Sequence, residues 1–547
     1  MFLDARSIRE DDDIVADVCI VGAGVAGLTL AREFKQAKFR TCIIESGGEK
    51  PDKPTQALYW GENVGLPYYP LDTARARLLG GSSHYWGVKL PGKGIGVRLR
   101  PMDPIDFEEK EWVPYSGWPF QKKHLDPYYE RAQKVCQIGP NSYDPKDWVQ
   151  PDLRNELPFV GDRVQTTIFQ FGLRDVFFKE YVREAKQAEN ITTLLHGNVI
   201  EIETNENATE VTRMRVACLE GSRFWVTAKI YILAMGAIEI PRLLLLSNKT
   251  QKSGLGNEHD LVGRFFMEHP HLWTGGFIPA SVMISNSTNL YEIFRKNGIH
   301  AMGKIALSES TLRKEKMLNW VTSIHPSYRL SYNHYMGHYE PGVSAYRAII
   351  LALKKGRLPE NIKNHIHDAL SDTKSIFRST YRKIKGHFKR DFSRSKHITV
   401  YRLNPMVEQA PNPESRVLLG TEKDALGQQR IQLNWQLTPL DTYTITRAQE
   451  ILDEELQQVG LGHLIIETEK DSVPSGLHGG WHHMGTTRMH SDPKQGVVDP
   501  NCRVHGISNL YIGGASAFPT GGYANPVLTT VALVLRLADH IRKIMDE

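Results

Sequence analysis

Short apolar runs separated by glycine-rich or polar breaks open the chain and predict a strand, a turn, a helix and a second strand. Residues 17–21 form the first apolar strand, and the turn Gly22-Ala-Gly24-Val-Ala-Gly27 follows directly. The next stretch has helical spacing, and the apolar run TCIIE then ends on Glu45. This order of elements is typical of a parallel β-α-β unit that binds a nucleotide.

The same alternation returns further along the chain. Strand-like runs occupy residues 191–205 and 222–237, and the second passes Gly236 into the apolar helical run IPRLLLLSN. We expect a second strand-to-helix crossing of the same sheet there. Residues 399–437 predict successive antiparallel strands around the polar turn APNPE, which could form the floor or lid of a substrate site. The chain ends on the run HHMGTTRM and a final apolar helix.

Each residue of the first motif has a physical role in nucleotide binding. Gly22 allows the tight turn, Gly24 lets the backbone approach a pyrophosphate, and Gly27 lets the helix pack on the strand. The positive end of the helix dipole then faces the phosphates. Glu45 can accept hydrogen bonds from both ribose hydroxyls and would repel a 2′-phosphate, so NADP is not expected. The motif by itself does not separate FAD from NAD.

Length and composition set the outer limits. A chain of 547 residues is too long for one core and predicts at least two domains. No apolar run approaches the twenty residues of a membrane helix, since Arg536 interrupts the best one. The start of the chain has no signal-peptide pattern, so we expect a soluble, cytoplasmic protein. The five cysteines are scattered, which argues against a metal site or a disulfide framework.

The net charge of +5 is unevenly distributed. Residues 374–396 hold nine Lys or Arg and a single acid, Asp391. This basic segment could dock on an anionic surface or a partner protein, although a solvated helical insertion has the same composition. No nucleic-acid-binding motif accompanies it, so a nucleic-acid partner is not expected.

Four motifs in order resemble the glucose–methanol–choline (GMC) flavoprotein oxidoreductases over nearly the whole chain. They are the Gly22–Gly27 turn with Glu45, RLLGGSSHYWG at 77–87, AMGAIEIPRLLLLSN at 234–248, and HHMGTTRM with the final helix. Within that family the chain is most similar to pyranose oxidases and bacterial glycoside 3-oxidases or 3-dehydrogenases. The resemblance implies FAD. Some family members attach FAD through a histidine where this chain has Tyr85, so non-covalent FAD is expected.

The resemblance also implies which residues form the site. His482 would be the base that takes the hydroxyl proton while flavin N5 takes the hydride, and Asn525 would bond the substrate oxygen. His483 is a further substrate-contact candidate, although a structural histidine is an equal reading. The residues expected to touch FAD are Gly22, Gly24, Gly27, Glu45, Gly80, Gly81, Ser82, Ser83, Val199, Ala234, Gly236, Gly514, Ala515, Asn525 and Pro526.

The function implied is oxidation of a secondary alcohol of a sugar or glycoside, at C2 or C3, to a keto-sugar. Oxygen or another electron acceptor would reoxidise the flavin. A non-sugar alcohol as substrate, or a non-redox flavin-dependent lyase of the same fold, are the alternatives. Aromatic and amide residues that could contact a sugar, or equally form core, are Trp273, Trp320, Tyr328, Tyr332, Asn333 and Tyr335.

The expected fold class is α/β. A Rossmann-like FAD-binding domain would comprise residues 14–100, 160–275 and 474–547. A second, α+β substrate domain on an antiparallel sheet would comprise residues 101–159 and 276–473, with the basic insertion 374–396. The oligomeric state stays open.

Overall fold

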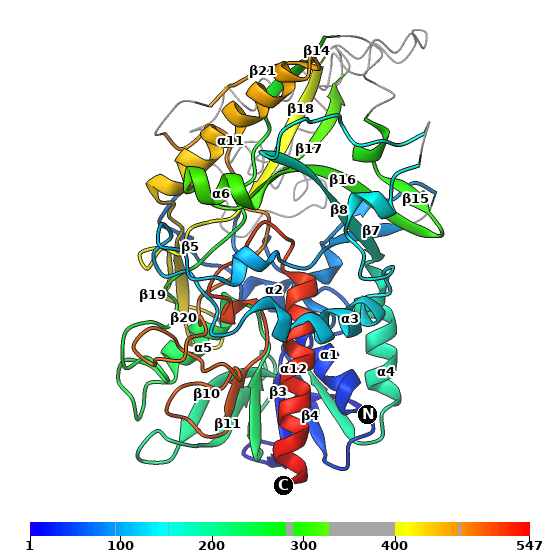
Figure 1. Cartoon of the computed structure of the whole chain (residues 1–547). Helices are drawn as coiled ribbons and strands as arrows, with labels where there is room; N and C mark the ends of the chain where they lie inside the picture. The colour runs from blue at the N-terminus through cyan, green and yellow to red at the C-terminus, as the bar shows by residue number, and fades with distance from the viewer. Residues whose placement is uncertain (93, 151–152, 281–287, 328–399, 469–471) are drawn as a thin grey trace, which may run out of the picture.

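A computed structural model describes residues 1–92, 94–150, 153–280, 288–327, 400–468 and 472–547. Figure 1 shows two stacked halves, with helix α12 and both termini in the lower one and helix α11 in the upper one. The basic segment 374–396 lies outside the described residues, as do Tyr328, Tyr332, Asn333 and Tyr335.

The lower half is built on a six-stranded parallel sheet. Its order is β1 (Phe2–Asp4), β9 (Ile191–Leu195), β4 (Thr41–Glu45), β3 (Val18–Val21), β13 (Ile230–Leu233) and β22 (Leu510–Ile512). The strands β3, β4 and β13 are buried at every position, because helices cover both faces of such a sheet. The helices α1 (Val25–Phe34), α3 (Asp126–Val135), α4 (Tyr181–Gln187) and α12 (Val527–Asp546) pack around it.

The first strand-to-helix crossing forms as the glycine spacing predicts. Gly22 has a φ of +100°, a conformation that favours glycine. A Cβ at Gly27 would lie 1.9 Å from the Gly22 carbonyl oxygen, so only glycine lets α1 begin this close to β3. The second crossing, from β13 into α5 (Glu239–Leu246), joins the same sheet beside β3, as expected.

A small sheet extends the lower half. It has the order β10 (Asn198–Thr204), β11 (Val211–Ala217), β12 (Arg223–Thr227) and β2 (Asp13–Val15). Beside α5 and α2 (Lys53–Ala57) lies a three-stranded sheet of β19 (Arg416–Lys423), β20 (Gln429–Asn434) and β5 (Glu62–Asn63).

The upper half is built on a nine-stranded antiparallel sheet. Its order is β21 (Gly462–Ile465), β14 (Thr274–Pro279), β18 (Val400–Val407), β17 (Trp320–Ser327), β16 (Ile299–Leu307), β8 (Val164–Leu173), β7 (Ile95–Leu99) and β6 (Val88–Lys89), and β15 (Phe294–Lys296) pairs with β16. The long helix α11 (Pro439–Gln458) packs on it, and α6 (Glu309–Glu315) follows β16.

The α/β fold class with a second, antiparallel sheet is confirmed, but the strands are distributed differently from the expected residue ranges. Strands β6, β7 and β8 fall in ranges expected to be FAD-binding, yet they belong to the antiparallel sheet. Residues 399–437 do form three strands, but β18 joins the large sheet while β19 and β20 join the small one.

Two further expectations concern the chain as a whole. Across the described ranges, the structure contains no helix with both the length and the apolar character needed to span a bilayer. All five cysteines are buried free thiols, and Cys19 and Cys42 lie in the parallel strands predicted to hold them.

Candidate active site

A cleft that is open to solvent at one side runs from the first glycine turn to the HHM motif. Most of the residues predicted to touch FAD line it. They are Gly22, Gly24, Glu45, Gly81, Ser82, Val199, Ala234, Gly236, Gly514, Ala515 and Pro526. Residues from both ends of the chain therefore share one cleft.

Four predicted cofactor residues do not line the cleft: Gly27, Gly80, Ser83 and Asn525. Gly27 provides the close packing of α1 on β3. Gly80 adopts a φ of +94° and a Cβ there would lie 2.5 Å from Cβ of Phe178. The buried Ser83 hydroxyl donates to the Gly80 carbonyl at 2.7 Å. Gly27, Gly80 and Ser83 serve tight turns and close packing, and their contact with FAD stays a prediction.

The cleft fits a long dinucleotide such as FAD. A Cβ at Gly24, Gly236 or Gly514 would meet no atom within 4 Å, so all three glycines leave open space along the cleft wall. His84 and Tyr85 are absent from that wall among the described residues, and the His84 ring is held 2.9 Å from the Leu79 carbonyl oxygen. This arrangement is consistent with FAD bound without a covalent link.

Glu45 ends β4 inside the cleft and is buried. Its Oε2 accepts from the Ala23 amide at 2.8 Å and its Oε1 from the Gly47 amide at 2.7 Å. Burial raises the pKa of this carboxyl, while the two backbone amides oppose the rise. The Ser46 hydroxyl also donates to Oε1, at 3.4 Å, so Oε2 is the oxygen that can still accept from a ribose hydroxyl. That contact stays a prediction.

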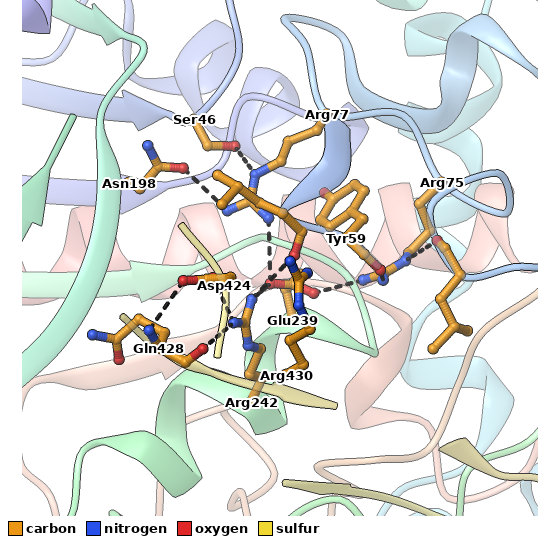
Figure 2. A network of polar contacts seen from close by, with 12 residues as sticks. Ser46, Tyr59, Arg75, Arg77, Asn198, Glu239, Arg242, Asp424, Gln428 and Arg430 are labelled. Atoms are coloured by element: carbon orange, nitrogen blue, oxygen red, sulfur yellow. Dashed lines mark hydrogen bonds and ion pairs between the residues drawn. The ribbon is translucent and has the colours of Figure 1, made fainter. Parts of the chain in front are cut away.

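A buried charge network closes another part of the cleft wall (Figure 2). Glu239, at the start of α5, contacts Arg75 at 2.8 Å, Arg242 at 3.3 Å and Arg77 at 3.5 Å. Arg242 also reaches Asp424 at 2.7 Å. Burial alone would raise the pKa of Glu239, but the three arginines lower it to about 2. No sequence pattern indicated this network, because its three parts, around residues 75–77, 239–242 and 424, lie far apart along the chain.

Arg77 joins this network to the nucleotide end of the cleft. Its Nε donates to the Ser46 hydroxyl at 3.0 Å and its Nη2 to the Asn198 side-chain oxygen at 3.2 Å. Ser46 follows the end of β4, and Asn198 begins β10. The guanidinium therefore holds together three segments that line the cleft.

His482 lies at the other end of the cleft with both ring nitrogens engaged. Its Nδ1 is 2.8 Å from Nδ1 of His269, and its Nε2 is 2.9 Å from Nδ2 of Asn525. Nε2 of His269 is 2.8 Å from the carbonyl oxygen of Gly522. The predicted pair His482 and Asn525 is thus brought together, and a third residue, His269, joins it.

These contacts fix where the protons lie. The Gly522 carbonyl can only accept, so His269 donates from Nε2 and, being neutral, accepts at Nδ1. His482 must then donate from Nδ1, which leaves a lone pair on its Nε2. Burial lowers the pKa of His269 to about 4 and that of His482 well below its usual value, so both rings are neutral at neutral pH.

His483 is placed differently from its neighbour. The Tyr68 hydroxyl donates to Oε1 of the buried Glu268, so its oxygen accepts from Nε2 of His483, 2.7 Å away. Burial lowers the pKa of His483 to about 3. The ring lines the cleft, but its Nε2 carries a hydrogen. Without the family resemblance, the sequence made His482 and His483 equal candidates for the base. The hydrogen bonds seen in the structure favour His482.

Glu268 fixes the backbone beneath the histidines. Its Oε2 accepts from the amides of Gly480 and His482, both at 2.9 Å. Burial raises the pKa of Glu268 to about 7. Sequence analysis did not single out Glu268 or His269. The only signal was an uncommon run, MEHPH, with two histidines around Pro270.

Trp481 projects at the mouth of the site. It is 42% exposed, lines the cleft, and has a φ of +60°, which is unusual for a bulky residue. Its ring centroid lies 5.1 Å from that of Tyr69, whose hydroxyl donates to the Gly479 carbonyl at 3.0 Å. Two aromatic rings therefore stand beside the two histidines.

A family model described as GMC oxidoreductase matches residues 411–533, which include the HHM motif and Asn525. This match identifies residues 411–533 as a GMC oxidoreductase domain. The family prediction made from the four motifs is confirmed, and with it the prediction of an oxidoreductase.

Two relatives match nearly the whole of this chain. The 2-methyl-1,2-propanediol dehydrogenase of Mycolicibacterium austroafricanum is 23% identical over 96% of this chain and 95% of its own. The fructose dehydrogenase large subunit of Gluconobacter japonicus is 26% identical over 97% of this chain and 98% of its own.

Two other comparisons are narrower or concern the fold. A C-glycoside 3-oxidase of Arthrobacter globiformis is 32% identical over 24% of this chain and 25% of its own. The crystal structure of a formate oxidase has a TM-score of 0.54 at 16% identity, covering 98% of this chain and 99% of that one. The latter shows the shared fold.

Proposed function

We propose that this GMC oxidoreductase binds FAD and oxidises a secondary alcohol of a sugar or glycoside, at C2 or C3, to a ketone. The observation that carries the proposal is His482, a neutral imidazole with a lone pair on Nε2 in a cleft shaped for a dinucleotide. FAD, when bound, supplies the acceptor for the hydride.

His482 would take the hydroxyl proton at Nε2. Its Nδ1 already donates to His269, and His269 donates onward to the Gly522 carbonyl. This chain of bonds fixes the ring and its tautomer before substrate arrives, and it stabilises the imidazolium that proton transfer creates. His269 is a positioning residue in this scheme.

Asn525 would orient the substrate. Its Nδ2 donates to Nε2 of His482, which keeps the amide oxygen on the other side. That oxygen is buried and has no hydrogen-bond partner within the described ranges. A buried acceptor of this kind needs a donor, and a neighbouring hydroxyl of the substrate would provide one. The hydroxyl that is oxidised would displace the Asn525 amide from Nε2 of His482, because that nitrogen has one lone pair, and its proton would then pass to Nε2.

The sugar as substrate class is supported by two observations. Trp481 and Tyr69 present aromatic faces at the mouth of the cleft, on which the C–H face of a sugar ring can pack. The relatives include a fructose dehydrogenase and a C-glycoside 3-oxidase. Trp320 is fully buried and belongs to the core.

A non-sugar diol is the second candidate substrate, because the 2-methyl-1,2-propanediol dehydrogenase also matches nearly the whole chain.

The direct test follows the flavin spectrum anaerobically while free sugars, methyl glycosides and 1,2-propanediol are added, and then admits air. We expect sugars or glycosides to bleach the band near 450 nm, with propanediol reacting poorly. Rapid recovery in air would indicate an oxidase, and slow recovery a dehydrogenase with another acceptor. Bleaching by propanediol alone would replace the sugar with the diol. No bleaching by any alcohol would favour the lyase alternative.

Trp481→Ala should weaken sugar binding. Loss of the aromatic face should raise the apparent dissociation constant for a reactive sugar about tenfold, on the usual scale of a stacking contact. The limiting rate of flavin reduction should change little, since the base is retained. Trp481→Phe keeps a ring and should lose less. A fall in the limiting rate with unchanged affinity would show that Trp481 acts on His482 and not on the sugar.

A further inference from the structure

Two basic side chains share one face of the antiparallel sheet, next to the histidine centre. In the register of the sheet, Arg98 on β7 pairs with Phe171 on β8, and Lys304 on β16 pairs with Thr167 on β8. Side chains two residues apart on a strand point to the same face, so Arg98 and Lys304 lie on one face, with Phe169 between their positions. Nζ of Lys304 lies 4.8 Å from the Phe169 ring centroid.

Neither cation has an anionic partner in the part of the chain that the structure describes. Lys304 is fully buried, and its Nζ makes no hydrogen bond there. No ion pair or hydrogen bond involves the Arg98 guanidinium among the same residues. Glu268, a buried carboxylate of this region, is already occupied by the Tyr68 hydroxyl and by backbone amides.

The groups around the two cations are imidazoles. Burial is the largest cause of the lowered pKa of His482 and of His325, and the charges of Arg98 and Lys304 lower both further. Burial also lowers the pKa of Lys304 well below its usual value, and Arg98 adds to this effect. Tyr523 connects this face of the sheet to the proposed base. Its ring centroid lies 6.1 Å from that of Phe169, its hydroxyl is 3.4 Å from that of Thr167, and the preceding Gly522 carbonyl accepts from His269.

A buried amine without an anionic partner is strongly unfavourable in its charged form, which is why the pKa of Lys304 falls, and proteins usually match such a group with an anion. Burying an ordinary hydrophobic residue at position 304 would avoid that cost. A lysine there, with an arginine beside it, is explained if a bound molecule provides the negative charge. Two basic groups on one face suit a carboxylate or a phosphate, each of which offers more than one oxygen.

We propose that Arg98 and Lys304 bind an oxyanion of the substrate, a carboxylate or a phosphate, beside His482. The substrate would then be an acidic sugar derivative, in which the carbinol faces the histidine and the oxyanion faces the sheet. This inference rests on the proposed sugar oxidation and names its substrate class. A neutral sugar would fill the same site but leave the two cations unmatched.

The test compares matched neutral and acidic sugars. D-Glucose, D-glucuronate and D-glucose 6-phosphate are added anaerobically to the FAD-loaded enzyme, and the affinity is taken from flavin reduction. We expect at least one acidic sugar to bind tenfold or more tightly than glucose, the usual scale of a charge-assisted hydrogen bond. The glucuronate and phosphate arms separate the two oxyanions.

Variants assign the preference to the named residues. Lys304→Met keeps the contact with Phe169 and removes the amine, so we expect it to fold and retain flavin. It should bind the acidic sugar at least tenfold more weakly and glucose unchanged. Lys304→Arg should recover part of the preference, and Arg98→Met should lose it. The control, Lys89→Met on the exposed end of β6, should behave as wild type.

A binding measurement without turnover separates this inference from the proposed function. Calorimetric titration of the holoenzyme with D-glucuronate, D-glucose 6-phosphate and inorganic phosphate should detect binding in wild type that Lys304→Met loses. If neutral sugars bleach the flavin and no acidic compound binds, the oxyanion site is wrong and sugar oxidation stands. If acids bind at Lys304 but no alcohol bleaches the flavin, the site stands as an anion site and the proposed oxidation is wrong.

Discussion

Replacing His482 with alanine should leave FAD bound yet slow its anaerobic reduction by a good substrate about 100-fold or more, the usual scale of lost general-base catalysis. The reason is the proton arrangement in the site. Through His269, the Gly522 carbonyl fixes the Nδ1 hydrogen of His482 and leaves Nε2 as the accepting nitrogen. The neighbouring His483 is held outside this chain of bonds, because its Nε2 donates to Tyr68.

Stopped-flow absorbance measures this rate, and the ratio of the 450 nm band to the protein band measures retained flavin. His540→Ala is a suitable control, since His540 lies on α12 away from the cleft wall. Added imidazole should partly restore the rate in His482→Ala, because the variant leaves a space of that shape. A variant with full flavin and an unchanged reduction rate would remove His482 from the mechanism.

Where the chemistry follows local motifs, the sequence predicted the site well. The glycine turn, β4 ending on Glu45, and the helix beginning after Pro526 are local features with their own physical requirements. Residues from both ends of the chain share the cleft, as the pairing of motifs suggested. His482 and Asn525 lie 43 residues apart in sequence and touch in the structure.

The part of the site that sequence analysis did not predict depends on contacts between residues that are distant in the sequence. His269 reaches His482 across 213 residues of sequence. Two isolated bridges hold these segments together, Met267 with Met484 and His271 with His478. Single bridges have no strand-like alternation, so hydrophobic periodicity does not reveal them. The boundaries of the antiparallel sheet were missed for a similar reason, because its strands come from separate parts of the chain.

Replacing Glu239 with glutamine should destabilise the protein by about 3–5 kcal/mol, the range for removing one member of a buried ion pair. Glu239 is the shared partner of Arg75, Arg77 and Arg242, and all four side chains are at most 10% exposed. Glutamine keeps the size and one acceptor oxygen but removes the charge. Three buried guanidinium groups would then have Asp424 as their one carboxylate in the network of Figure 2.

Urea unfolding of the holoenzyme, followed by tryptophan fluorescence, measures the change. The matched control is Glu309→Gln on α6, whose carboxylate contacts Arg313 at 2.7 Å but is 51% exposed, so it should cost at most about 1 kcal/mol. Because Arg75, Arg77 and Glu239 line the cleft, Glu239→Gln should also release FAD faster, while Glu309→Gln should not. Equal stability of the two variants would mean that the arginines find other partners when Glu239 loses its charge. The network would then serve to shape the cleft more than to stabilise the fold.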